Sequence, residues 1–146
     1  MKTHSVKPNE VTRKWYIIDA STASFGRIST EAARLLLGKD KPHFSHHIDC
    51  GDYVIVINSD KLVATGAKLD KKMYYSHSGY PGALKEMTLG EKMKKDSTQV
   101  IHHAVRGMLP DNKLRAERLA RLKIYPGEEH PHDPQKPINL SKKAGS

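Results

Sequence analysis

A chain of 146 residues is long enough for one domain with a hydrophobic core and too short to divide comfortably into two. Hydrophobic residues make up 37% of it and charged residues 28%, which argues against whole-chain disorder and predicts a modest core. The formal net charge of +9 makes a polyanion the first partner to test. One cysteine, Cys50, excludes an internal disulfide framework. No apolar stretch approaches the roughly 18 residues of a membrane span, so we expect a soluble protein with no membrane partner.

The positive excess lies in two segments. Residues 61–95 carry eight lysines and three acidic residues, residues 102–123 carry six basic and two acidic residues, and the rest balances at eleven of each. A run of charge is commonly an ordinary solvated helix face, and here it is equally compatible with a polyanion-binding surface.

Two apolar runs and the segment between them predict the core. Residues 15–19 (WYIID) and 53–57 (YVIVI) are continuous, β-branched and aromatic, which is typical of strands covered on both faces. From Phe25 to Leu36 the apolar residues recur with helical spacing, and Gly38 supplies a stop. Strand, helix and strand in this order predict a parallel βαβ unit.

The second half predicts shorter elements. Residues 61–82 contain glycine and proline turns and are expected to form an irregular excursion. Thr88 begins a capping-box sequence for a short basic helix, and Ser97 is expected to cap a second one, with both helices on the sheet. A third helix is expected over residues 113–122 and a last short strand over residues 123–125.

The expected organisation is a basic N-terminal arm (1–14), one α/β domain (15–125) and a Pro-rich C-terminal tail (126–146). The tail has four prolines in 21 residues and no periodicity. We expect it to be extended or disordered until a partner orders it.

The helix predicted at residues 113–122 carries Arg115, Arg118 and Arg121 at three-residue steps. On a helix these side chains spread over an arc of roughly 120° and form a cationic ridge. Guanidinium groups can fork onto phosphates and stack on bases, which favours an RNA partner. The alternative is an ordinary exposed helix with Glu117 and Arg121 as an ion pair.

A second pattern favours RNA. Residues 68–82 mix lysines with tyrosines and a histidine, and combine phosphate-seeking charge with rings that stack on unpaired bases. The glycine turn near His77 lets backbone N–H groups approach phosphate closely. The alternative is that Tyr74 and Tyr75 are core residues of a hairpin.

Metal, cofactor and catalytic sites have weaker support. Neither His46-His47 near Asp49 nor the segment 129–133 matches a metal-ligand spacing, and HExxH is absent. The first strand is followed by a single glycine, so neither GxGxxG nor a Walker loop is present and no cofactor is expected. The rival interpretation is a small cytoplasmic α/β enzyme that uses Cys50 or a histidine cluster, with a polar pocket around it.

Several short motifs follow one another over nearly the whole chain: WYIIDA (15–20), FGR (25–27), GK (38–39), GDYVIVIN (51–58), ATG (64–66), HSG (77–79), VRGMLP (105–110) and LKIY (122–125). Together they resemble the bacterial branch of the ribosomal protein L13 family. The resemblance implies a three-layer α/β/α domain around a mostly parallel four-stranded sheet, with extended terminal tails. It also implies a non-catalytic protein of the large ribosomal subunit in the cytoplasm, which binds 23S rRNA and neighbouring ribosomal proteins early in assembly. Some members also repress their own mRNA, which remains a secondary possibility.

Three features depart from the family pattern. Arg115-Ala116 stands where the family shows Gly-Arg, Cys50 occupies a position that tolerates other small residues, and residues 141–146 extend past the usual end. The first-ranked RNA contacts are Lys68, Lys71, Lys72, His77, Arg106, Lys113, Arg115, Arg118, Arg121 and Lys123. The second-ranked ones are Arg27, Arg34, Lys39 and Lys41. We expect no metal, no small-molecule substrate and no catalytic residue. A free regulatory RNA-binding protein would use the same surface.

Overall fold

A parallel sheet of four strands forms the centre of the computed structural model, which describes residues 4–140. The strands are β1 (Trp15–Asp19), β2 (Tyr53–Ile57), β5 (Leu122–Ile124) and β6 (Ile138–Asn139), in the order β5-β2-β1-β6. Strands β1 and β2 pair along their whole length, from Trp15 opposite Tyr53 to Asp19 opposite Ile57. The predicted α/β class with a parallel four-stranded sheet is confirmed, and β5 begins one residue earlier than expected.

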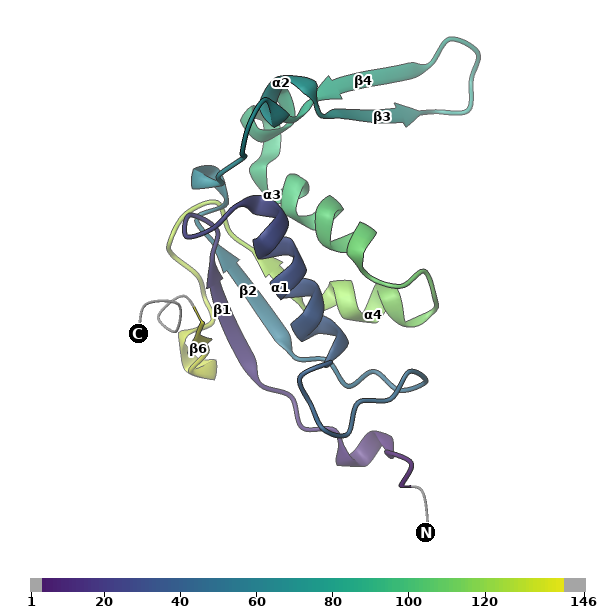
Figure 1. The fold of residues 1–146 in the computed structure, drawn as a ribbon, viewed down its shortest axis with the longest axis vertical. Helices are drawn as coiled ribbons and strands as arrows, with labels where there is room; N and C mark the ends of the chain where they lie inside the picture. Colours follow the sequence, from purple (N-terminus) through teal and green to yellow (C-terminus); the bar gives the residue numbers. More distant parts are fainter. Residues whose placement is uncertain (1–3, 141–146) are drawn as a thin grey trace.

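Helix α1 (Phe25–Leu37) connects β1 to β2 and packs on one face of the sheet. It ends at Gly38, whose left-handed backbone (φ +77°) suits a residue without Cβ. Helix α3 (Leu89–Met108) lies beside α1, and α4 (Leu114–Ala120) packs near the ends of both (Figure 1). The apolar side chains of this layer close the main core together with Ile18, Val54 and Val56 of the sheet.

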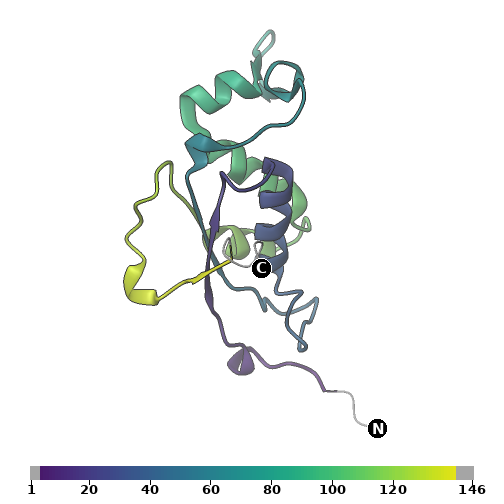
Figure 2. The ribbon, with the colours of Figure 1, turned by 60° about the vertical axis from the view of Figure 1, so that its left-hand side comes forward.

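The other face of the sheet is covered without an α-helix. Ile17, Ile55 and Ile57 form a small second core there, with Trp15 and Tyr125 packed against it. Figure 2 shows residues 126–137 on this side of the strands, opposite α1, with the short 3-10 turn η3 (Asp133–Gln135). The segment is held by His132, whose Nε2 lies 2.6 Å from the hydroxyl of Tyr125. The layer on this face is therefore an extended segment.

The C-terminal segment differs from the expected tail. Ile138 and Asn139 pair with Tyr16 and Ile17 of β1, and the backbone N–H of Leu140 donates to the carbonyl of Ile17 at 3.1 Å. The physical reason is that β1 would otherwise leave an edge of unpaired backbone groups. A strand of two residues has no periodicity to detect in the sequence. Residues 141–146, the predicted extension, lie outside the described residues.

The expectation of an irregular excursion over residues 61–82 is wrong. The chain forms the turn η2 (Ser59–Lys61), the short helix α2 (Lys68–Lys71) and an antiparallel hairpin of β3 (Met73–His77) and β4 (Leu84–Thr88). The hairpin projects beyond the sheet (Figure 1). Most of its side chains are exposed, so it lacks the alternation of apolar and polar residues that marks a strand packed on a core.

Helix α3 consists of two segments that meet at Asp96, which has non-helical backbone angles. The capping box is confirmed, because Thr88 and Glu91 bond each other's backbone N–H. The predicted cap Ser97 is wrong by one residue: Asp96 accepts from the N–H of Thr98 at 3.0 Å. Ser97 is buried and instead donates to Asp60 of η2 at 2.5 Å. The first segment therefore packs on α2 and β4, and the second lies along α1.

The described part of the N-terminal arm is docked on the domain. Val6 is buried, just before the 3-10 turn η1 (Pro8–Glu10). Arg13 donates to the carbonyl of Gly51 at 2.6 Å and to that of Asp49 at 3.1 Å. The arm is thus joined to the loop that precedes β2.

Candidate nucleic-acid interface

Lysines without acidic partners gather where α2 and the hairpin join α3. The ammonium groups of Lys68 and Lys72 lie 5.9 and 5.3 Å from the centroid of the Phe25 ring. That of Lys92 lies 4.1 Å from the centroid of Tyr74. None of these three lysines, nor Lys71, forms an ion pair with another described residue. Their charge is therefore available to an anionic partner.

The second segment of α3 extends this positive region. His103 meets the Tyr74 ring edge-on, with centroids 5.2 Å apart, and Arg106 is exposed one turn further on. Burial lowers the pKa of His103 below its usual 6.5, and the charges of Lys92, Lys72 and Arg106 lower it further. The lowered pKa of His103 thus reflects its burial and the positive charges around it.

The hairpin presents aromatic rings to solvent. Tyr75 is 65% exposed and Tyr80 is 76% exposed, so both can stack on unpaired bases. Tyr74 points to the other side of the strand and packs against the main core. The alternative of a hairpin with both tyrosines in the core therefore holds for Tyr74 but not for Tyr75. The backbone N–H of Gly79, expected to approach phosphate, donates to Nδ1 of His77 at 2.9 Å.

The predicted cationic ridge on α4 does not form as one surface. Arg118 and Arg121 are 1% and 7% exposed, and both turn inward to Asp49. Arg115 remains half-buried, with its guanidinium 2.8 Å from Asp111. The three-residue spacing therefore did not predict a common surface: Arg118 and Arg121 meet the buried carboxylate of Asp49, whereas Arg115 pairs with exposed Asp111. The alternative pair of Glu117 with Arg121 does not form either.

Asp49 is the centre of this inward-facing group, which we call the Asp49 network (Asp49, Arg13, Arg118 and Arg121). Arg121 binds both carboxylate oxygens, one at 2.7 Å. Burial alone would raise the pKa of Asp49, but the hydrogen bonds and charge of Arg121 lower it below 3.8. The network joins three segments that are distant in sequence, so its arginines serve the fold.

Lys41 is also used within the protein. Its ammonium lies 2.7 Å from Asp52 and donates to the carbonyls of Thr12 and Cys50. On α1, Arg27 is exposed, whereas the exposed Arg34 pairs with Glu31 at 2.6 Å. Exposed Lys39 and Lys113 and half-buried Lys123 lie on other parts of the surface.

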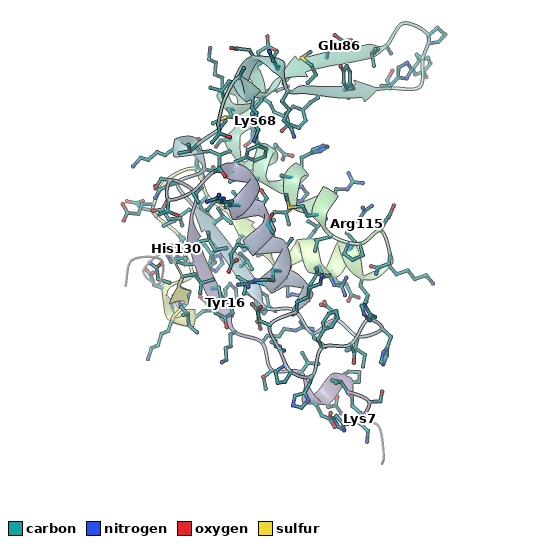
Figure 3. All side chains as sticks on the ribbon, viewed as in Figure 1. Lys7, Tyr16, Lys68, Glu86, Arg115 and His130 are labelled. Atoms are coloured by element: carbon teal, nitrogen blue, oxygen red, sulfur yellow. The ribbon has the colours of Figure 1, made fainter. Side chains whose placement is uncertain are left out.

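The structure adds Lys92, Lys95 and His103 to the candidate residues. In Figure 3 the labels of Lys68 and Glu86 mark this end of the molecule, and Arg115 lies apart from it on α4. With Gln99 they are spaced by three, four and four residues. Lys92 and Lys95 precede the kink at Asp96, Gln99 and His103 follow it, and all four line the same groove. That spacing was available in the sequence. A hairpin was considered only as an alternative for Tyr74 and Tyr75, and nothing in the sequence indicated that it would form a groove with α3.

The rival interpretation placed Cys50 in a polar pocket, and Cys50 does line a pocket of about 290 Å³ together with Lys41, His43 and Asp52. Cys50 is buried, and its sulfur lies 3.8 Å from the backbone carbonyl of His43, not from an imidazole. Within residues 4–140 no three His, Cys, Asp or Glu side chains are grouped to hold a metal ion. The helices in the same range include none that is both long and apolar enough to span a bilayer.

Comparison with known proteins identifies the family. The family model for ribosomal protein L13 matches residues 13–131. The chain is 52% identical to the large ribosomal subunit protein uL13 of Thermotoga maritima over 136 residues, 93% of this chain and 91% of the relative. It is 53% identical to that of Carboxydothermus hydrogenoformans over 135 residues, 92% and 94% of the two chains. The chain therefore belongs to the ribosomal protein L13 family.

Proposed function

We propose that this protein is a structural, non-catalytic component of the large ribosomal subunit that binds 23S rRNA and supports early subunit assembly. The family match over residues 13–131 carries the proposal, because it includes strands β1, β2 and β5 of the sheet, the hairpin and helices α1 to α4 together. The curated relatives are named as proteins of the large ribosomal subunit, which is located in the cytoplasm. Its partners there are 23S rRNA and the neighbouring ribosomal proteins.

The charge distribution supports an RNA partner. Exposed cations that lack acidic partners release counterions when they neutralise phosphates, and this release dominates nucleic-acid affinity. The proposed contacts are Lys68, Lys71, Lys72, His77 and Arg106, with Arg27, Arg34, Lys39, Lys113, Arg115 and Lys123 as further surface contacts. The hairpin adds Tyr75 and Tyr80 for stacking. Arg118, Arg121 and Lys41 are assigned to the fold.

The test is fractionation of cell lysate on sucrose gradients at moderate and high salt, with the protein followed by mass spectrometry and bound RNA sequenced. We expect co-migration with the large subunit and recovery of 23S rRNA. A protein that stays among free soluble proteins at both salt concentrations would contradict the proposal. Recovery of an mRNA without 23S rRNA would favour the free regulatory alternative.

A pair of double variants tests the surface. Lys68→Gln with Lys71→Gln removes two charges beside the hairpin, and Lys7→Gln with Lys136→Gln removes two exposed charges far from it. The first variant is expected to lower the slope of log affinity against log salt concentration by about 0.7 to 0.9 for each phosphate that is no longer neutralised. Equal slopes for the two variants, measured by filter binding to 23S rRNA, would mean that the hairpin end is not a preferred surface.

A further inference from the structure

A groove of about 560 Å³ lies between the hairpin and α3. One wall is β3 and β4 with Tyr74 and Lys85, and the other is the face of α3 that carries Lys92, Lys95, Gln99 and His103. The kink at Asp96 divides that wall. The groove therefore depends on a turn in α3 and on a hairpin that lies far from the sheet.

Three lysines, Lys85, Lys92 and Lys95, line the groove together with His103. The ammonium groups of Lys92 and of neighbouring Lys72 lie 4.1 and 5.7 Å from the centroid of Tyr74, and His103 meets the same ring. Neither Lys92 nor Lys72 has an ion-pair partner in the range 4–140. Asp96 and Glu86 also line the groove, and the hydroxyl of Thr98, which donates to Asp96 at 2.6 Å, lowers the pKa of Asp96 and keeps it ionised. The three lining lysines therefore exceed the two carboxylates by one positive charge, and Lys72 adds another beside the groove.

We propose that this groove binds the phosphodiester backbone of an RNA strand, with Lys92, Lys95 and His103 as the phosphate-binding side chains. The proposal rests on the proposed function and assigns it a particular site. It adds three residues of α3 to the surface lysines of α2 and gives the hairpin a role as one wall of the site.

Phosphate fits the groove better than a base does. A base would stack on an open aromatic face, but Lys92 already lies over the ring of Tyr74. The open rings are Tyr75, which lines the groove and is 65% exposed, and Tyr80 at the hairpin tip, which is 76% exposed. A strand whose phosphates lie in the groove would therefore have these two exposed rings available for stacking of its bases.

Phosphate binding in the groove is expected to be coupled to the uptake of a proton by His103. The charged groups near His103 are Lys92, His102 and Arg106 on α3 and Lys72 before β3, with Lys95, Asp96, Lys85 and Glu86 along the groove. The pKa of free His103 lies below 6.5 because of burial and these cations. A bound phosphate would favour imidazolium and raise that pKa, so binding takes up a proton and strengthens as pH falls.

The experiment measures binding of the full chain to a 23S rRNA transcript by filter binding. Lys92→Gln is compared with Lys94→Gln, an exposed lysine of the same helix that does not line the groove. We expect Lys92→Gln to weaken binding about tenfold, the loss of one charge-assisted hydrogen bond, and Lys94→Gln to change it much less. Lys95→Gln is the second groove variant and is expected to resemble Lys92→Gln.

The pH dependence provides an independent readout. His103→Gln is compared with His46→Gln, an exposed histidine in the loop before β2. The gain in wild-type affinity as pH falls from 7.5 to 5.5 is expected to shrink in His103→Gln, by up to about tenfold per pH unit. His46→Gln should keep the wild-type pH dependence.

The outcomes separate this site from the broader function. If the wild type binds 23S rRNA but Lys92→Gln and Lys95→Gln match Lys94→Gln, the groove is not the site and the proposed function stands. If the groove variants bind rRNA normally but enter large subunits poorly, the groove holds an acidic segment of a neighbouring protein and the phosphate proposal is wrong. If the wild type itself fails to bind rRNA, both proposals fail.

Discussion

Asp49 connects the N-terminal arm, the loop before β2 and the chain just after α4, because its carboxylate meets Arg13, Arg118 and Arg121. The three guanidinium groups do not contribute equally. Arg121 binds both carboxylate oxygens and the carbonyl of Leu36, whereas Nε and Nη1 of buried Arg118 have no hydrogen-bond partner among the described residues. A buried charge is costly unless its hydrogen bonds are complete.

The two arginines should therefore respond differently to removal of their charge. Arg121→Met leaves Asp49 without its bidentate partner and is expected to lower the free energy of unfolding by about 3 to 5 kcal/mol. Arg118→Met removes a charge with incomplete hydrogen bonding and keeps the buried volume, so it is expected to be nearly neutral or stabilising. Urea unfolding of both variants checks this. A loss of similar size in both would show that Arg118 contributes as much as Arg121.

Gly51 explains why the network closes so tightly. A Cβ at this position would lie 1.7 Å from the carbonyl oxygen of Leu36 and 2.6 Å from Nη2 of Arg121. Only glycine allows the end of α1, the loop before β2 and Arg121 to approach one another this closely. Gly51 begins the motif GDYVIVIN, but its close approach to Leu36 and Arg121 is known only from the structure.

Among the candidate site residues, exposure to solvent was most predictable for the lysines. Lys68, Lys71 and Lys72 belong to a short polar segment without an apolar face, and all three are exposed. Arg118 and Arg121 could not be assigned in advance, because helical spacing identifies a stripe but not the direction it faces. Their partner, Asp49, is 72 residues from Arg121 in the sequence.

The hairpin is the element whose loss should separate binding from folding. Replacing residues 77–84 by Asn-Gly joins Ser76 to Lys85, which already face each other, through a two-residue turn. The midpoint of thermal unfolding is expected to change little, because the removed residues are mostly exposed and Leu84 itself is 56% exposed. Affinity for 23S rRNA is expected to fall, because Tyr80 and His77 are removed. A large drop in the unfolding midpoint would show instead that the hairpin stabilises the domain.

The core elements followed their sequence patterns. The strands at residues 15–19 and 53–57 appeared with the predicted bounds, because β-branched runs of this length favour a buried parallel strand. Helix α1 ends at Gly38 as expected, and the capping box opens α3 at Leu89. The hairpin was only an alternative interpretation and β6 was not predicted, because neither has a repeating apolar pattern.

The pH dependence of the free energy of unfolding arises from ionisable groups in several parts of the molecule. His132 lies in the segment 126–137 and contacts Trp15 and Tyr125, and burial together with His130 and Lys123 lowers its pKa below 6.5. Several carboxylates have lowered values too: the pKa of Asp49 is reduced by Arg121 despite burial, and that of Asp96 by the hydroxyl of Thr98. In each case the unfolded chain binds the proton more readily than the folded one.

The free energy of unfolding should therefore be highest above pH 6.5 and fall in two stages as pH decreases. The histidine contribution is lost as pH falls from 6.5 through the lowered folded pKa values of His132 and His103. The carboxylate contribution is lost below 3.8, as pH falls through the folded values of Asp49 and Asp96. Urea unfolding between pH 8 and 3 measures both stages. Constant stability between pH 7.5 and 5 would contradict the role given to the histidines.

The amino-acid sequence was enough to predict the parallel βαβ centre, α1, the division of the second half into short helices, and the family resemblance, because each depends on local periodicity or a local motif. It also identified the lysines near the hairpin as candidates for RNA. The tertiary structure was needed to show that Arg118 and Arg121 face Asp49, that residues 126–137 cover one face of the sheet while Ile138 and Asn139 pair at its edge, and that Lys92 and His103 line a groove. These features arise from contacts between distant segments, where burial of charge and pairing of strand edges outweigh local preference.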